Sequence, residues 1–178
     1  MLKAPKFWYQ KKDTFYSASL YPLSLLFRFG TTIRNFISTK KSSPIPIICI
    51  GNIVVGGAGK TPVSIKVGKL LIKSGYKPHF ISKGYSGLIK DSTLVESWHS
   101  PSSVGDESIL LSEVAPTWIG SDRVKSSYLA MESGADCLIM DDGFQNPSIE
   151  KNFSIIVINS EQEFGNKRVM PSGPLRES

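Results

Sequence analysis

From residue 42 onward, short apolar runs alternate with stretches in which apolar residues recur every three or four positions. The apolar runs predict strands, at 45–50, 79–82, 93–97, 117–120, 137–141 and 153–158. The periodic stretches between them predict helices, at 62–74, 106–114 and 122–133. Apolar strands separated by helices are typical of a mainly parallel sheet with helices on both faces. The pattern therefore predicts an α/β domain over residues 42–178.

The first of these predicted helices has well-defined ends. Pro62 lies in its first turn, and Gly75 follows its last residue. We expect an apolar stripe on this helix to face the sheet, formed by Val63, Val67, Leu70 and Leu71.

The first 41 residues have a different pattern. Their longest apolar run, 20–29, contains Pro22 and Arg28 and is shorter than the roughly 20 residues that a membrane-spanning helix needs. Across residues 1–41, aromatic and aliphatic residues are mixed with eight Lys or Arg residues and one acid, Asp13. We expect residues 1–41 to form an amphipathic helical segment, and this pattern fits association with a membrane surface as well as it fits packing within the protein. Packing of the helix against its own domain is the alternative, and nucleic-acid binding is disfavoured because no recognition module is present.

The composition indicates one folded domain in a reducing compartment. The chain has 178 residues, of which 40% are hydrophobic and 20% charged, and this excludes a disordered chain. The net charge of +6 comes from the N-terminal segment, because the rest of the chain is nearly balanced. Cys49 and Cys137 lie in apolar runs, so we expect buried thiols and a cytoplasmic protein.

A glycine-rich segment joins the first predicted strand to the first predicted helix, with the sequence Gly51-Asn52-Ile53-Val54-Val55-Gly56-Gly57-Ala58-Gly59-Lys60-Thr61-Pro62. This is the context of a phosphate-binding loop, because glycines let backbone N–H groups turn toward phosphate oxygens beside a helix N-terminus. Lys60 would reach the β- and γ-phosphates, and Thr61 would hold Mg²⁺ through its hydroxyl. Val54 replaces the first glycine of the usual pattern. A glycine-rich turn without a ligand is the alternative.

Two adjacent acids, Asp141 and Asp142, follow an apolar run. Open α/β sheets bind ligands at the carboxyl ends of their strands, and the Mg²⁺ of a nucleotide needs an acidic partner there. Neighbouring side chains of an extended chain point to opposite sides. One carboxylate would therefore serve the metal while the other faces the substrate or a neighbouring loop, and the sequence leaves open which does which. A strand that merely ends in Asp is the alternative.

A third acidic position, Gly105-Asp106-Glu107, opens a predicted helix. Acids are common at helix starts because they complement the helix dipole. The functional interpretation makes Asp106 a general base for an attacking hydroxyl. Two glycine-containing loops carry further charges. Residues 82–87 are either a turn or part of a site, and residues 165–177 are either functional or disordered.

In this order, the motifs resemble the tetraacyldisaccharide 4′-kinase family, the lipid A 4′-kinases of Gram-negative bacteria. The matching segments are G-N-x-x-x-G-G-x-G-K-T-P at 51–62, S-K-G-Y at 82–85, G-D-E at 105–107, D-D-G-F-Q at 141–145 and P-x-G-P-L-R-E at 171–177. Lys83 stands where the family usually has Arg. The resemblance covers the N-terminal portion of the family's sequence, which continues beyond the last motif.

The resemblance implies a P-loop NTPase-like fold and transfer of the ATP γ-phosphate to the 4′-hydroxyl of a tetraacyldisaccharide 1-phosphate, giving lipid IVA in lipid A biosynthesis. It implies ATP and Mg²⁺ as cofactors, and peripheral attachment of residues 1–41 to the cytoplasmic face of the bacterial inner membrane. No nucleic acid and no obligate protein partner are expected. A nucleotide-binding module without turnover and another P-loop ATPase are the alternatives, although Val55 stands where partitioning-type ATPases have a lysine.

The resemblance also implies roles for individual residues. The ATP phosphates would be surrounded by Val55, Gly56, Gly57, Ala58, Gly59, Lys60 and Thr61. The metal would be bound by Thr61, Glu107 and Asp141. Catalysis would involve Lys60, Asp106 and Asp142, with Asp106 matching the family's proposed catalytic aspartate.

Overall fold

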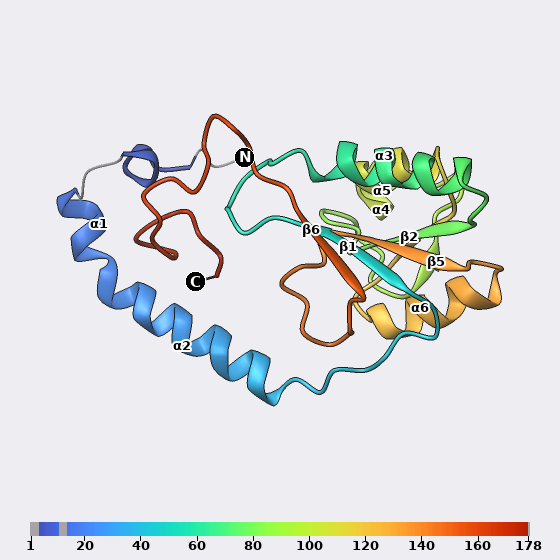
Figure 1. The fold of residues 1–178 in the computed structure, drawn as a ribbon, viewed down its shortest axis with the longest axis horizontal. Helices are drawn as coiled ribbons and strands as arrows, with labels where there is room; N and C mark the ends of the chain where they lie inside the picture. Colours follow the sequence, from blue (N-terminus) through green and yellow to red (C-terminus); the bar gives the residue numbers. More distant parts are fainter. Residues whose placement is uncertain (1–3, 11–13, 178) are drawn as a thin grey trace. The chain divides into compact units, whose positions relative to one another are not determined.

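The computed structural model describes residues 4–10 and 14–177 (Figure 1). The chain forms two compact units. The first unit comprises Met1–Thr39, Asn52–Gly59 and Ile156–Ser178, and the second comprises Lys40–Gly51 and Lys60–Ile155. The predicted boundary at residue 41 is close to the first change of unit, but the structure adds two later stretches to the N-terminal segment. Lys3, Lys11 and Lys12 of the predicted basic segment lie outside the described residues.

The sheet has six strands, which are β1 (Ile47–Gly51), β2 (Pro78–Ser82), β3 (Thr93–Leu94), β4 (Thr117–Ile119), β5 (Cys137–Asp141) and β6 (Phe153–Ile156). Their order is β3-β4-β2-β5-β1-β6. The central pairs β1–β5, β2–β5 and β2–β4 are parallel, and β3 pairs antiparallel with β4. This confirms the predicted mainly parallel sheet. It also brings the ends of β1 and β5 together, since Ile50 is in register with Asp141.

Helices cover both faces of this sheet, as predicted. On one face, α3 (Lys60–Lys73) and α5 (Asp106–Ser112) contact each other and the central strands. On the other face, α6 (Arg123–Glu132) packs against β2, β4 and β5 (Figure 1). The short helix α4 (Pro101–Val104) immediately precedes α5. The core between these layers includes Phe80, Leu138 and Ile139, and both cysteines are buried free thiols, as expected.

The face that α3 turns toward the sheet differs from the predicted one. Its buried residues are Thr61, Ser64 and Gly68, whereas Leu70 of the predicted stripe is 61% exposed. Gly68 explains the difference, because a Cβ atom there would lie 2.6 Å from Cζ of Phe80. The missing side chain lets the helix approach the sheet along its small and polar residues. The predicted buried stripe is therefore wrong at Leu70, and its other three members are only partly buried.

In the first unit, the N-terminal helices pack on the C-terminal segment. They are η1 (Lys6–Tyr9), α1 (Phe15–Ser19) and α2 (Tyr21–Ile37). Their contacts include several hydrogen bonds. The hydroxyl of Ser24 donates to the Val169 carbonyl (2.8 Å) and accepts from the Ser172 N–H (3.1 Å). The indole N–H of Trp8 donates to the Pro171 carbonyl (3.0 Å).

Helix α2 leaves most of its apolar residues exposed. Ser24 is its buried residue, and large side chains recurring every three or four positions point away from it: Leu26 (67% exposed), Phe29 (66%), Ile33 (39%), Phe36 (90%) and Ile37 (73%). The predicted amphipathic helix is thus present, with its polar side against its own unit. Across residues 4–10 and 14–177, no helix combines the length and apolar character needed to cross a bilayer.

Candidate functional site

The glycine-rich loop of the first unit, residues 52–59, is braced by the C-terminal segment of the same unit. The Val55 N–H donates to the Pro174 carbonyl (2.8 Å), and the Arg176 N–H donates to the Ile53 carbonyl (2.7 Å). The P-x-G-P-L-R-E motif therefore fixes the base of the loop through backbone hydrogen bonds. Its sequence pattern indicated a loop with charged residues but not this supporting role.

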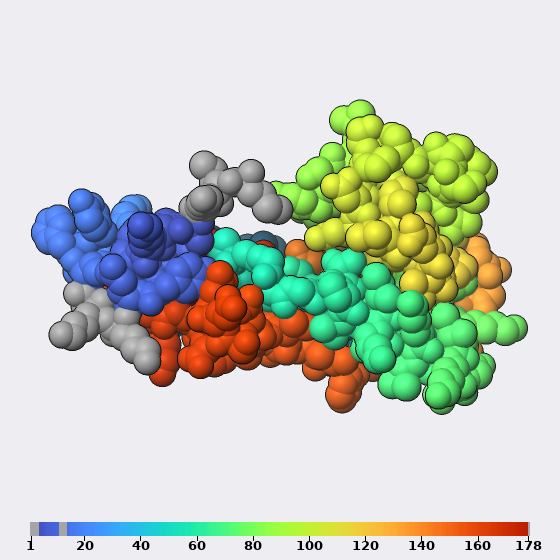
Figure 2. Space-filling view, turned by 90° about the horizontal axis from the view of Figure 1, so that it is seen from above, coloured from blue at the N-terminus to red at the C-terminus, as the bar shows by residue number. Residues whose placement is uncertain are grey.

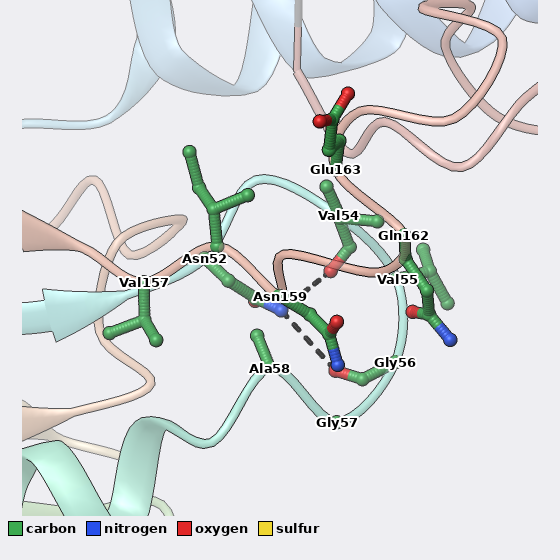
Figure 3. A pocket seen from close by; sticks show the side chains of 11 residues that line it. Asn52, Val54, Val55, Gly56, Gly57, Ala58, Val157, Asn159, Gln162 and Glu163 are labelled. Atoms are coloured by element: carbon green, nitrogen blue, oxygen red, sulfur yellow. Dashed lines mark hydrogen bonds between the residues drawn. The ribbon is translucent and has the colours of Figure 1, made fainter.

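Asn52 shapes the first half of the loop from inside. Its side chain is fully buried, and its amide donates to the carbonyls of Val54 (2.7 Å) and Gly56 (3.2 Å) (Figure 3). Gly56 has a φ of +125°, which favours glycine. The tip of the loop, Gly56 and Gly57, is exposed, and Figure 2 shows the loop (teal) at the surface as it runs toward α3 (green). The loop is thus held at its base and open at its tip.

Residues 157–163 face this loop across a small cavity within the first unit (Figure 3). Its polar lining includes Asn159, Gln162 and Glu163. The cavity measures about 10 Å³, which is about the room that one water molecule needs. It is therefore too small to be a nucleotide pocket.

In the second unit, the start of α3 meets the end of β5. The hydroxyl of Thr61 donates to Oδ2 of Asp141 (3.3 Å), and the hydroxyl of Ser64 donates to Oδ1 (2.7 Å). Asp141 is 1% exposed. Its burial, reinforced by the charge of Asp142, raises its pKa, while the two hydroxyl hydrogen bonds and Lys60 oppose the increase. The structure thus brings the predicted loop end and the predicted acid together.

Asp142 makes a different contact from Asp141. One of its carboxylate oxygens lies 3.4 Å from Nζ of Lys60. Asp142 has a φ of +51°, so the chain is not extended there, and the argument from an extended pair is wrong at this residue. The turn continues at Gly143, where a Cβ would clash with the side chain of Met140. The two acids nevertheless divide their contacts, Asp141 toward hydroxyls and Asp142 toward a cation.

Asp106 and Glu107 begin α5 in the same unit, and both are exposed. The pKa of Glu107 is raised, first by partial burial and then by the charge of Asp141, with Lys60 opposing. Glu107 therefore belongs to the same electrostatic cluster as the acids at the end of β5. Asp106 is exposed and directly precedes Glu107, a member of that cluster, in the sequence.

Arg123, the first residue of α6, is a buried positive charge that interacts with this cluster. It is 3% exposed, and its Nη1 donates to the Gly120 carbonyl (3.2 Å). Burial lowers its pKa to about 10, while the charges of Asp142 and Asp141 act in the opposite direction. A guanidinium with this pKa stays protonated at neutral pH. Its charge therefore partly balances the adjacent carboxylates.

The residues at the end of β5 fit a magnesium ion. Within residues 4–10 and 14–177, no three His, Cys, Asp or Glu side chains are grouped closely enough to hold a metal by themselves. Mg²⁺, however, commonly takes one or two carboxylates and completes its shell with water and phosphate oxygens. Thr61 Oγ1 and Asp141 Oδ2 are 3.3 Å apart. Adjacent oxygens around Mg²⁺ are separated by about 3 Å, since the metal–oxygen bonds are about 2.1 Å in octahedral geometry.

Sequence comparison identifies the family. A family model described as tetraacyldisaccharide-1-P 4′-kinase matches residues 16–178. The chain belongs to this kinase family. Among curated relatives, the tetraacyldisaccharide 4′-kinases of Paramagnetospirillum magneticum and a Jannaschia species are 45% and 42% identical, and each alignment covers 99% of this chain and 54% of the relative. The chain thus spans about half the length of the curated 4′-kinases that it matches.

A solved structure agrees with this assignment. It is described as the "apo" form of LpxK from Aquifex aeolicus in complex with ATP. Its TM-score against this chain is 0.77 at 29% sequence identity, and the match covers 91% of this chain and 54% of that one. The predicted family and the predicted α/β fold are both confirmed.

Sequence reasoning missed three residues of this member of the 4′-kinase family. Asn52 was visible only as part of a motif, and Arg123 as an ordinary helix residue. Ser64 had a usable signal, because it follows Thr61 by three positions and residues at that spacing share a helix face. The interpretation of that face as apolar concealed it.

Proposed function

We propose that this chain supplies the nucleotide-binding and acidic part of an ATP-dependent kinase acting on the 4′-hydroxyl of a tetraacyldisaccharide 1-phosphate, with lipid IVA as product. The observation that carries the proposal is the contact of Thr61 with Asp141, which joins the end of the predicted phosphate loop to the predicted metal-binding acid. Membership in the 4′-kinase family supports the acceptor. The description of the related Aquifex aeolicus structure as a complex with ATP supports the phosphate donor.

In this proposal, the backbone N–H groups of residues 56–59 bind the ATP phosphates, as the motif predicts. The Val55 N–H is not among them, because it donates to the Pro174 carbonyl and holds the base of the loop. Lys60 stabilises the negative charge on the phosphate being transferred. Its side chain is 11% exposed and pairs with Asp142. Asp142 would therefore keep the ammonium group oriented until phosphate oxygens share it.

Thr61 and Asp141 would hold Mg²⁺, with Glu107 in the surrounding acidic cluster. When bound, the ion supplies positive charge for the β- and γ-phosphates. The buried position of Asp141 and its two hydroxyl partners support this assignment over Asp142, which already pairs with Lys60.

We assign proton removal to Asp106. As the 4′-hydroxyl oxygen bonds to the γ-phosphorus and the bond to the ADP oxygen breaks, the hydroxyl proton would pass to the Asp106 carboxylate. The exposure of Asp106 supports this role, because the acceptor must approach from solvent or from a lipid surface. Its place at the start of α5, beside Glu107, puts it next to the acidic cluster.

We further propose that α2 attaches the protein to an anionic lipid surface, at the cytoplasmic face of the inner membrane. The exposed apolar residues of α2 support this, since Leu, Ile and Phe on one helix side can enter the headgroup boundary. Arg28 and Arg34 are exposed on the same helix and would meet anionic lipid. An acylated acceptor is itself held at such a surface.

The test is turnover by the purified chain with ATP, Mg²⁺ and the disaccharide lipid in mixed micelles, followed by mass spectrometry of the product. We expect Lys60→Ala and Asp106→Ala to lower turnover by about 10²–10³-fold, the usual effect of losing one charge-stabilising or proton-accepting group. Lys66→Ala is the matched control, because Lys66 is an exposed lysine on the same helix.

The possible results separate two functions. Product formation that depends on Lys60 and Asp106, but not on Lys66, supports the kinase. ATP binding without product supports a nucleotide-binding module instead. A chain that binds no nucleotide would contradict both.

A further inference from the structure

Two hydroxyls on α3, one helical turn apart, meet the two oxygens of the Asp141 carboxylate. Ser64 donates to Oδ1 at 2.7 Å, and Thr61 donates to Oδ2 at 3.3 Å. Since 2.7 Å is the usual length of an O–H···O hydrogen bond, the Ser64 contact is the tighter one. The less tightly held oxygen is Oδ2, which accepts from Thr61 at the end of the predicted phosphate loop.

The Ser64 contact differs from those of Ser24, Ser126 and Ser127, because its acceptor is a carboxylate and theirs are carbonyl oxygens. Helical serines commonly bond a carbonyl of their own helix. Ser126 and Ser127 of α6 do so, donating to the carbonyls of Asp122 and Val124. Ser64 is equally buried, at 0% exposed, but donates to a carboxylate on a neighbouring strand.

The packing of α3 keeps this contact in place. Gly68, one turn beyond Ser64, lies where a Cβ would meet Phe80 of β2. The helix is therefore seated on the sheet through small residues, and the Ser64 hydroxyl cannot be reached from solvent. Such a hydroxyl is unsuited to contact a nucleotide, but it can fix the plane of the Asp141 carboxylate.

We propose that Ser64 is a positioning residue that anchors Oδ1 of Asp141 so that Oδ2 is presented, beside Thr61, to a divalent cation. This rests on the proposed function, in which Thr61 and Asp141 hold the Mg²⁺ that accompanies ATP. Hydrogen-bonded partners of metal ligands typically change metal affinity by 10–100-fold when removed. The role goes beyond the phosphate-loop pattern, which ends at Thr61.

The test measures binding of the fluorescent analogue mant-ATP to the 178-residue chain, in EDTA and over a titration of Mg²⁺. For Ser64→Ala, we expect affinity in EDTA to remain as in the unmodified chain, while the Mg²⁺ concentration for half-maximal binding rises about 10–100-fold. Ser64→Thr keeps the hydroxyl and should restore most of the Mg²⁺ response. In an Asp141→Asn background, Ser64→Ala should have no further effect, because the carboxylate that it positions is gone.

Ser127→Ala is the matched control, since it removes an equally buried serine hydroxyl from a helix on the other face of the sheet. Thermal unfolding of each variant establishes that it is folded. An unchanged Mg²⁺ response in folded Ser64→Ala would overturn the role of Ser64 alone. An equal loss of affinity with and without Mg²⁺ would also overturn it, by showing a general packing effect. Absence of nucleotide binding by the unmodified chain would instead overturn the proposed function and, with it, the role of Ser64.

Discussion

Helices α2 and α3 depart from the same packing rule in opposite directions. An amphipathic helix normally buries its apolar stripe and exposes its polar side. Helix α3 buries Thr61, Ser64 and Gly68 and leaves Leu70 exposed, while α2 buries Ser24 and leaves Phe29 and its apolar neighbours exposed. In each helix, the side that breaks the rule is the side to which we assign a function.

The two departures have different physical causes. On α3, polar groups are buried because each hydroxyl has a carboxylate oxygen as its partner, which offsets the cost of removing it from water. On α2, the buried Ser24 makes polar contacts with the C-terminal segment of its own unit. Its apolar side then stays available for a lipid surface. Buried polar and exposed apolar groups are therefore both informative, but about different partners.

The largest effect that we expect from this comparison concerns α2 and lipid. Replacing Phe29 and Phe36 together with Ser should weaken binding to anionic vesicles by about 100-fold, because each phenyl ring contributes about 1.4 kcal/mol or more when it leaves water. Sedimentation with vesicles containing phosphatidylglycerol measures the change.

The matched control is Leu70→Ser, which removes an exposed apolar side chain from α3 instead of α2. It should change vesicle binding little. A comparable loss in Leu70→Ser would show that lipid contact is not specific to α2 and would remove the distinction between the two helices.

We expect a smaller effect on stability, of opposite sign in the two helices, when a glycine in each is replaced by alanine. Gly68→Ala should lower the free energy of unfolding by about 1–3 kcal/mol, because the added Cβ would lie 2.6 Å from the ring of Phe80. Gly30→Ala on α2 should raise it by about 0.5–1 kcal/mol, since nothing lies within 4 Å of that position and alanine favours a helix. Denaturant unfolding followed by circular dichroism compares them. Equal effects at both glycines would contradict the close seating of α3.

The sequence was most informative where one strong local signal determined the structure. The strand Cys137–Asp141 has its predicted bounds, since a wholly apolar run followed by acids has few other interpretations. The strand predicted at 93–97 is observed only at Thr93–Leu94. Edge strands of this kind depend on one pairing partner, here β4, and local propensity does not fix their length.

What the sequence could not supply were contacts set by tertiary packing. The buried side of α3 depends on one glycine opposite one phenylalanine, Gly68 and Phe80, which are 12 positions apart in the chain. Asp141 and Asp142 have different partners, and Asp142 has a positive φ, a backbone conformation that is uncommon outside glycine. Neither can be derived from periodicity alone.

The smallest effect that we expect is a difference in pH dependence between the two regions. His79 on β2 is 5% exposed and accepts a hydrogen bond from the Trp118 indole (3.3 Å), and burial lowers its pKa, partly opposed by Asp136. The unfolded chain therefore binds a proton at His79 more readily than the folded chain does. The free energy of unfolding thus falls as the pH drops below about 6.5, by at most about 1.4 kcal/mol per pH unit.

His79→Gln should flatten the dependence of denaturant unfolding on pH between 7.5 and 5.5. Vesicle binding through α2 should stay constant over that range, because α2 carries only Arg28 and Arg34 as charged residues. A pH-dependent slope that survives in His79→Gln would assign the sensitivity to other groups.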